Sequence, residues 1–171
     1  MSSIIKVDTI QNAAGTTGLT IDSNGVITTP AKPIFKAKGA DNVILSNNIL
    51  TKLQFNSTEI DVGSNFDTSN YRYVPQVAGK YFIYGKVYIT YNSVSTEYLE
   101  LQLQKNGSQH DAYYRYSNGS TEIYGSLSLS TIVDMNGSTD YLDLHTRVSI
   151  STDAKYYTSS HFGEFSGFLI S

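Results

Sequence analysis

The feature that most constrains the fold of this chain is an alternation of apolar and polar residues with a period of two, which begins near Pro33. In residues 81–91 the odd positions are mostly aliphatic or aromatic, and the even positions carry Phe82, Tyr84, Lys86, Tyr88 and Thr90. Residues 98–103, 126–130 and 142–150 alternate in the same way. Such alternation is typical of antiparallel strands that bury one face, and no long stretch shows the period of a helix. The sequence therefore predicts an all-β sandwich or barrel.

Composition excludes several classes of protein. The chain has no cysteine, which rules out disulfides and thiolate metal sites and favours synthesis in a cytosol. Its beginning lacks the basic and apolar regions of a signal peptide, and no apolar run approaches the ~20 residues of a membrane span. A net charge of -3 with only 16% charged residues argues against a nucleic-acid surface. We therefore expect neither nucleic-acid binding nor membrane insertion.

Residues 1–32 differ from the rest and predict an extended N-terminal segment, followed by a globular head at residues 33–171. The stretch 19–27 predicts a small hairpin with a type I′ turn at Asn24-Gly25, and Pro30 and Pro33 mark the boundary. The segment has too few apolar residues for a core of its own, and an isolated hairpin is marginal in water. We expect it to be disordered, or to order only by pairing with copies of itself or with a partner.

Two motifs in the head resemble one known family. The first comprises Phe66–Asp67, Tyr71–Pro75 and Ala78–Ile83, and the second is the closing stretch Phe165-Ser166-Gly167-Phe168-Leu169. In order and spacing they resemble the jelly-roll domain shared by complement component C1q and tumour necrosis factor. The resemblance implies a ten-strand antiparallel jelly-roll sandwich that is not an enzyme. It also implies a bell-shaped homotrimer with flat aromatic faces along its threefold axis.

Two glycines of these motifs have predicted structural roles. We expect Gly79 to allow a left-handed turn into the strand that follows it. We expect Gly167, which lies between Phe165 and Phe168, to let neighbouring aromatic rings approach the backbone of the last strand.

The opening of the chain resembles a second group of proteins. Ile5–Gln11, a Gly/Thr-rich stretch and Ile21–Ile27 together are similar to the start of tail-fibre and head-fibre proteins of marine bacteriophages. This implies a virion structural protein, a trimeric fibre or capsid decoration knob made in the host bacterial cytoplasm. Its N-terminal segment would bind other virion proteins, as an anchor or an intertwined shaft, and its head would contact a host surface glycan or protein. The candidate anchor residues are Ile4, Ile5, Val7 and Ile10.

No catalytic motif is found in the sequence. His110, His145 and His161 have no partner at the spacing of a metal site or a catalytic elbow. Glu59 and Asp61 are two apart, which predicts that both point to one face of a strand, as a carboxylate pair or as a solvated edge. Calcium is known in the C1q family, and its candidate ligands here are Asp61, Asp67 and Asp134, although an EF-hand spacing is absent. We expect no other cofactor and no enzymatic activity.

Two tyrosine-rich stretches are the candidate partner-binding sites. Residues 110–118 and 151–158 combine aromatic rings with polar groups, which together stack on and orient a glycan or a protein. The candidate residues are Tyr113, Tyr114, Arg115, Tyr116, Tyr156 and Tyr157. The alternative is that these tyrosines alternate into the core and the trimer interface. Binding through them would also suit a lectin-like or protein-binding module of cellular origin, which is the alternative to a virion protein.

Overall fold

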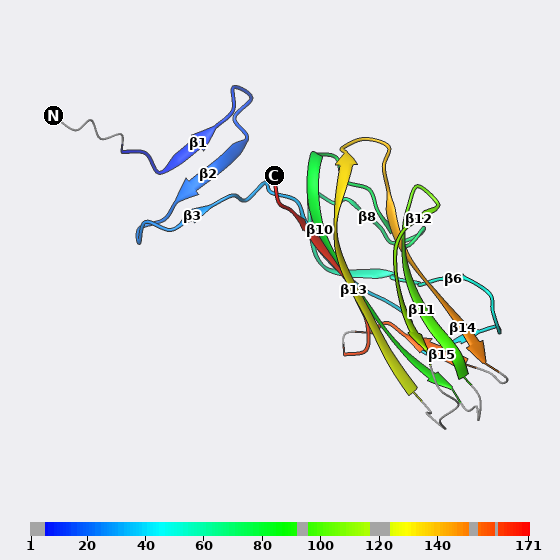
Figure 1. The fold of residues 1–171 in the computed structure, drawn as a ribbon. Helices are drawn as coiled ribbons and strands as arrows, with labels where there is room; N and C mark the ends of the chain where they lie inside the picture. The colour runs from blue at the N-terminus through cyan, green and yellow to red at the C-terminus, as the bar shows by residue number, and fades with distance from the viewer. Residues whose placement is uncertain (1–5, 92–95, 117–123, 151–153, 160) are drawn as a thin grey trace.

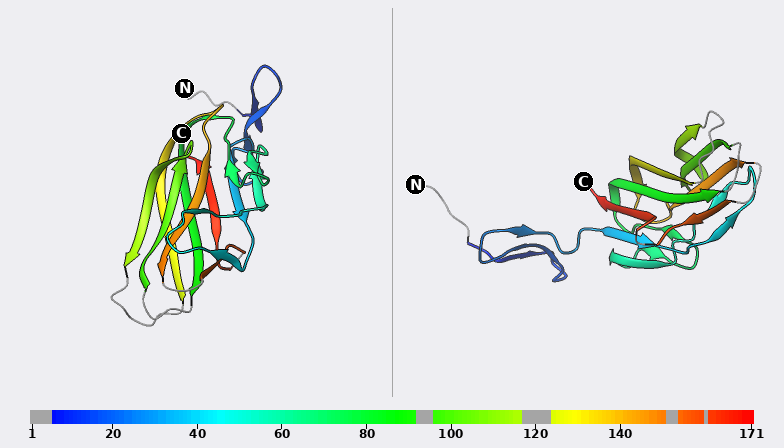
Figure 2. Two further views of the ribbon diagram at one scale, coloured as in Figure 1. Left: turned by 90° about the vertical axis from the view of Figure 1, so that its right-hand side faces the viewer. Right: turned by 90° about the horizontal axis from the view of Figure 1, so that it is seen from below.

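The computed structural model describes residues 6–91, 96–116, 124–150, 154–159 and 161–171, and the regular elements of this part are all β-strands (Figure 1). The predicted all-β class is therefore confirmed. A small N-terminal sheet lies apart from a sandwich of two larger sheets, and the right-hand view of Figure 2 shows a single segment of chain between them. The strands outnumber the ten that the resemblance implies, because several are pieces of only two or three residues.

The N-terminal sheet is antiparallel and has no core. It consists of β1 (Thr9–Gln11), β2 (Thr17–Ile21) and β3 (Ile27–Thr28), paired in that order. The expected hairpin is present, but its turn is not type I′, because only Gly25 of the central pair has a positive φ. Instead, Asp22 Oδ1 accepts the N–H groups of Asn24 and Val26 at 2.9 and 2.8 Å. All residues from 6 to 32 are exposed or half-exposed.

The first sheet of the head is built around one long central strand. β10 pairs along one side with β13 and along the other with β16 and β15, and the sheet continues through β4 to β7 and through β15 to β5. All of these pairings are antiparallel. The strands are β4 (Ile34–Lys38), β5 (Val43–Leu45), β7 (Ser57–Val62), β10 (Ala78–Tyr91), β13 (Tyr124–Asn136), β15 (Ala154–Tyr157) and β16 (Glu164–Leu169).

The second sheet is also antiparallel, with the order β12-β11-β14-β9-β8 and β6 beside β14. Its longest turn-linked pair, β11 and β12, is joined at Asn106-Gly107, where both residues have positive φ (54° and 78°), as a two-residue hairpin turn requires. The strands are β6 (Thr51–Lys52), β8 (Phe66–Asp67), β9 (Arg72–Tyr73), β11 (Thr96–Lys105), β12 (Ser108–Tyr116) and β14 (Leu142–Ile150).

The core lies between the two sheets and confirms the alternation read from the sequence. In β10 the buried positions are Tyr81, Ile83, Val87 and Ile89, whereas the even positions from Phe82 to Thr90 are half-exposed on the outer face. An aromatic group forms one end of the core, where the rings of Phe35 and Tyr73 stack with centroids 4.0 Å apart. The rings of Phe165 and Phe35 are nearly perpendicular, with centroids 5.1 Å apart. β10 therefore presents every second residue to the exterior.

Both glycines singled out in the sequence lie in strands, Gly79 in β10 and Gly167 in β16, where neighbouring atoms leave no room for a Cβ. A Cβ at Gly167 would lie 2.6 Å from the carbonyl oxygen of Phe82 and 2.9 Å from the ring of Phe35, so the predicted approach of an aromatic ring is confirmed. Gly79 has a positive φ of 151°, a backbone conformation that residues with a Cβ rarely adopt, so the expected need for glycine at this position is confirmed. A Cβ there would also collide with the backbone of Ser171, so Gly79 makes room for the end of the chain.

Candidate partner-binding surfaces

A row of apolar side chains crosses the outer face of the first sheet. Cross-strand pairing places Ile132 beside Phe82, Phe82 beside Phe168, and Phe168 beside Ile34. These four residues, which we call the apolar row, come from β13, β10, β16 and β4. Ile132 is 57% exposed and Phe168 is 43% exposed, and the rings of Phe82 and Phe168 are 5.4 Å apart. A contiguous apolar patch on an exterior face is typical of a protein interface.

A second group of rings, the aromatic cluster, lies toward the other end of the same face. Tyr88 of β10 is its centre, with ring centroids 5.2 Å from Phe162, 5.9 Å from Tyr157 and 6.2 Å from Tyr124. The hydroxyl of Tyr157 donates a hydrogen bond to Asn42 Oδ1 at 2.7 Å, which fixes that ring. Tyrosine rings held in this way bury area at low entropic cost when a partner covers them.

Between these two groups the outer face of the sheet is polar. Tyr84 lies beside Ser130 and Ser166, and Lys86 lies beside Ser128 and Glu164. Lys36 of β4 pairs with Glu59 at 3.0 Å and approaches Glu164 at 3.8 Å. Lys86 donates a hydrogen bond to the His161 carbonyl at 3.3 Å. The face therefore has apolar ends and a polar centre.

The three calcium candidates are engaged separately by protein donors. Asp67 accepts hydrogen bonds from Asn70 and Arg72, and the Asn70 side chain is the main cause of its lowered pKa. Asp134 pairs with Lys80 at 2.6 Å on the exterior of β13. Within the described ranges no three His, Asp or Glu side chains gather into a group that could hold a metal ion. The structure thus does not bring Asp61, Asp67 and Asp134 together as a common site.

The expectation that Glu59 and Asp61 point to one face of β7 is wrong. The register between β4 and β7 shifts at Lys36/Ala37, and this irregularity breaks the alternation of β7. Glu59 then pairs with Lys36 and Lys38, and these contacts lower its pKa. The carboxylate of Asp61 instead accepts the N–H groups of Asn65 and Phe66 at 2.9 and 3.1 Å, closing the turn after β7.

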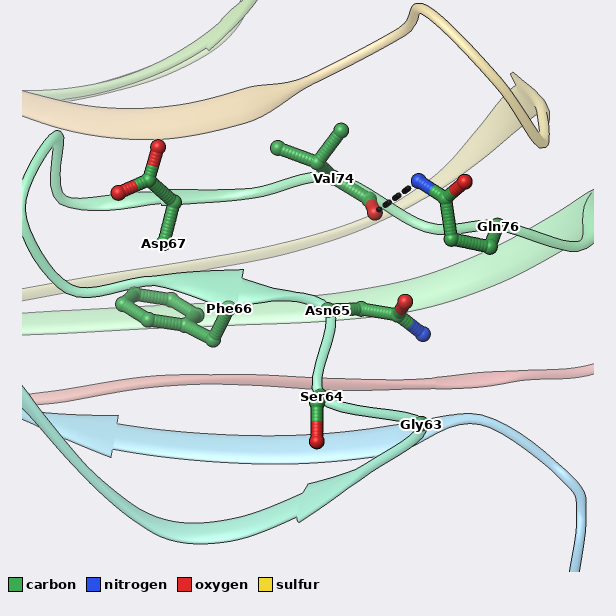
Figure 3. Close-up of a pocket in the computed structure, with 7 residues that line it drawn as sticks. All are labelled: Gly63, Ser64, Asn65, Phe66, Asp67, Val74 and Gln76. Carbon is green, nitrogen blue, oxygen red and sulfur yellow. Dashed lines mark hydrogen bonds between the residues drawn. The ribbon is translucent and has the colours of Figure 1, made fainter.

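A shallow hollow of about 250 Å³ lies beyond this turn (Figure 3). Its lining comes from the β7–β8 turn, from β8 and from the segment after β9: Gly63, Ser64, Asn65, Phe66, Asp67, Val74 and Gln76. The Gln76 amide donates a hydrogen bond to the Val74 carbonyl at 3.1 Å, so both partners of this bond belong to the lining of the hollow. The charged group of the lining, Asp67, is already neutralised by Arg72 at 3.2 Å. The hollow has no arrangement of acid, base and nucleophile.

The structure separates the tyrosines that the sequence grouped together. On β12, Tyr114 and Tyr116 share the outer face of the second sheet with Glu100 and Tyr98 of β11, to which they are paired. Tyr113 and Arg115 occupy the alternate positions of the same strand, opposite Leu101 and Leu99. Tyr157 belongs to the aromatic cluster of the first sheet. Residues 117–118 and 151–153 of the two stretches lie outside the described residues.

Tyr156 is the clear correction among these candidates. It is paired with Ile89 and points inward, so its side chain has no exposed surface and it cannot serve as a partner-binding residue. Its hydroxyl accepts the backbone N–H of Gln54 at 3.1 Å, and burial raises its pKa to about 12. Tyr156 points into the core and Tyr157 toward the surface, because successive side chains of a strand point to opposite faces of the sheet.

The histidines also have ordinary environments. His110 and His161 are exposed, and the His145 ring lies 3.1 Å from Asp143 Oδ1 on the outer face of the second sheet. Lys52 is the second partner of Asp143. In the part of the chain that is described, no helix is long and apolar enough to span a bilayer.

Of the anchor candidates, Val7 and Ile10 are exposed, and Ile4 and Ile5 lie outside the described residues. Ile10 is paired with Leu19 in the small N-terminal sheet. Val26 and Ile27 of that sheet, which the sequence did not single out as anchors, are also exposed. They could have been identified from the sequence, because any β-branched apolar residue in a segment too small to form a core is expected to be exposed.

Comparison with known proteins finds matches in structure but not in sequence. No protein-family model and no curated protein sequence matches the chain. The globular domain of zebrafish complement 1qA protein is similar with a TM-score of 0.62 and 15% identity, over 82% of this chain and 98% of that one. Murine APRIL, a tumour necrosis factor family protein, is similar with a TM-score of 0.61 and 11% identity, over 81% and 99%. The head therefore has the C1q/tumour necrosis factor jelly-roll fold.

Proposed function

We propose that this chain is a structural protein of a bacteriophage virion, a trimeric fibre or decoration knob without enzymatic activity. Its head would associate through the outer face of the first sheet, and its N-terminal segment would attach it to the particle. The head would then project and contact the host surface. The observation that carries this proposal is the apolar row, Ile132, Phe82, Phe168 and Ile34, left facing the exterior of a single chain.

The argument for self-association begins with burial. Each side chain of the apolar row loses contact with water if a second surface covers it, which contributes about 25 cal/mol per Å² of apolar area. The aromatic cluster on the same face would add a second patch, with Tyr88 at its centre. The proposed threefold symmetry comes from the C1q and tumour necrosis factor resemblance, whose members pack as trimers around flat aromatic faces.

The proposed attachment role rests on the N-terminal sheet. Its three short strands bury nothing, and so small an isolated sheet is marginal in water. Exposed residues such as Ile10, Val26 and Ile27 would become buried if the segment paired with a virion protein or with its own copies. The resemblance of the opening residues to phage fibre proteins supports the virion assignment.

The interface is tested by placing a charge in the apolar row. Ile132→Glu would put a carboxylate where the partner chain must exclude water, so we expect the purified protein to become monomeric at micromolar concentration. Ile49→Glu is the matched control, because Ile49 is also 57% exposed but lies between β5 and β6, next to the second sheet. Light scattering that finds the two variants in the same oligomeric state would contradict this choice of interface.

The attachment role has a separate test. We expect deletion of residues 1–32 to abolish incorporation into particles while the head remains folded. Incorporation at the level of the full chain would remove the N-terminal segment as the anchor.

A further inference from the structure

Three tyrosine rings form a triangle on the outer face of the second sheet. Tyr98 of β11 and Tyr114 and Tyr116 of β12 have ring centroids 6.1 to 6.3 Å apart, and the planes of Tyr114 and Tyr116 differ by only 19°. Tyr116 is 72% exposed and Tyr114 is 37% exposed. We call these three residues the tyrosine patch. Its rings are therefore close together, partly parallel and open to solvent.

An ion pair between a buried carboxylate and a partly exposed guanidinium supports this patch. The Glu100 side chain has no exposed surface, and its carboxylate accepts hydrogen bonds from Arg147 at 2.7 Å and from the Tyr114 hydroxyl at 2.9 Å. The Arg147 guanidinium also lies 5.7 Å from the centre of the Tyr98 ring. The Tyr98 hydroxyl donates to Asn48 Oδ1 at 2.8 Å. Two of the three rings are thus fixed through their hydroxyl groups, which reduces the entropy lost when a ligand stacks on them.

The surroundings of the patch are polar but electrically matched. Arg147 is paired with Glu100, and Lys52 is paired with Asp143, which also contacts His145. Next to them the side-chain amides of three glutamines form a hydrogen-bonded chain: Gln104 to Gln102 at 2.6 Å, and Gln102 to Gln109 at 2.8 Å. The described charges of this face leave no excess of either sign for an ionic ligand to meet.

We propose that the tyrosine patch binds a neutral saccharide chain, with Tyr114 and Tyr116 stacking on the apolar faces of sugar rings. An uncharged ligand fits a face whose charges are already paired, and sugar hydroxyls fit the amides of Gln104 and Gln109 at its border. An acidic glycan would meet no unpaired cation among the charged groups just named. Tyrosines also anchor protein partners, but the centre of a protein interface is depleted of charged residues, whereas this patch contains the Glu100–Arg147 ion pair.

The proposed saccharide would be the host-surface ligand of the proposed function, and only its place on a host surface rests on that function. The patch lies on the second sheet, whereas the proposed trimer interface lies on the first sheet, so the two surfaces do not compete. The proposed saccharide can accordingly be tested on the full chain whatever its oligomeric state is.

The test measures binding of the full chain to two sets of immobilised oligosaccharides. The neutral panel contains hexose oligosaccharides, and the acidic panel contains sialylated and uronic-acid oligosaccharides. We expect binding on the neutral panel, and we expect Tyr116→Ala to weaken it by about tenfold or more, the loss typical of a central aromatic contact. Tyr141→Ala is the matched control, because Tyr141 is a half-buried ring with Arg72 at 5.0 Å over it, at the start of β14. It should bind as the unmodified chain does.

Other outcomes overturn the inference. Binding confined to the acidic panel, binding to neither panel, or equal binding by Tyr116→Ala and the unmodified chain would each exclude a neutral saccharide at this patch. Light scattering on the same samples separates this failure from that of the proposed function, because Tyr116→Ala is expected to leave the trimer mass unchanged.

Discussion

The guanidinium of Arg147 lies 2.7 Å from the carboxylate of Glu100, a side chain without exposed surface at the middle of the second sheet. The two residues face each other across β14 and β11, so the strand register itself creates the pair. Glu100 also receives the hydroxyl of Tyr114, which raises the pKa of that tyrosine. One buried charge therefore connects the stability of the sandwich with the surface that carries the tyrosine patch.

Removing Arg147 should destabilise the fold. Arg147→Ala leaves the Glu100 carboxylate buried without its cation, and we expect a loss of about 3 kcal/mol in the free energy of unfolding, near the lower end for a broken buried ion pair because Arg147 is partly exposed. The double variant Glu100→Gln/Arg147→Ala should recover part of this loss. Urea denaturation gives the values, and a loss below about 1 kcal/mol for the single variant would mean that the pair is not buried in solution.

Acid should destabilise the head through Asp143. Burial raises the pKa of Asp143, but hydrogen bonds from His145 and Lys52 outweigh it, and the net pKa lies below its usual 3.8. A lowered carboxyl pKa contributes stability that is present above about pH 4 and is lost as the pH falls through the lowered value. Asp67 and Asp140, whose pKa values are lowered mainly by Asn70 and Asn106, act in the same direction. Melting temperatures between pH 2 and 7 should fall less steeply for Asp143→Asn than for the unmodified chain, and parallel curves would disprove the contribution.

Alkali should act through the buried tyrosines. Burial raises the pKa of Tyr156 to about 12, so the folded state keeps its proton more tightly than the unfolded chain, and the resulting stability is lost above about pH 10. Tyr156→Phe should cost about 1 kcal/mol at neutral pH, because the Gln54 N–H loses its acceptor, but its stability should fall less between pH 9 and 11. Burial also raises the pKa values of Tyr73 and Tyr81, so the unmodified chain and Tyr156→Phe should both still lose some stability at alkaline pH. An unchanged slope would show that Tyr156 ionises freely.

A methyl group at Gly167 should not fit. Gly167→Ala places Cβ 2.6 Å from the Phe82 carbonyl oxygen and 2.9 Å from the Phe35 ring, and we expect a loss of about 2 kcal/mol from overpacking. Gly18→Ala is the control, because the nearest atom to its Cβ is 3.8 Å away. Thermal melting that finds equal effects of the two substitutions would contradict the close approach seen at the last strand.

The sequence predicted the class of the fold well because alternation is a local property. Every even residue from Phe82 to Thr90 could be assigned to the outer face before any partner strand was known. The motifs around Val74-Pro75 and Phe165–Leu169 added the jelly-roll topology. Alternation also assigns Tyr156 and Tyr157 to opposite faces, but the choice of face depends on which strand lies beside them.

The surfaces could not be predicted because they depend on register between distant strands. The apolar row joins residues from four strands, and nothing local links Ile132 to Ile34. The tyrosine patch was found only in part, since Tyr98 and the buried Glu100 lie about fifteen residues from Tyr114 and Tyr116 in the chain but beside them in the sheet. Glu59 and Asp61 were misassigned because an irregular register in β7 cannot be read from its residues.

The most direct test of the account is the solution mass of the intact chain and of a version that starts at Lys32, measured by light scattering at micromolar concentration. We predict three chain masses for both proteins, because the proposed interface lies wholly on the first sheet of the head. A trimer only with the N-terminal segment present would transfer the assembly to an intertwined shaft and contradict the role of the apolar row. Monomers in both cases would contradict the trimeric knob itself.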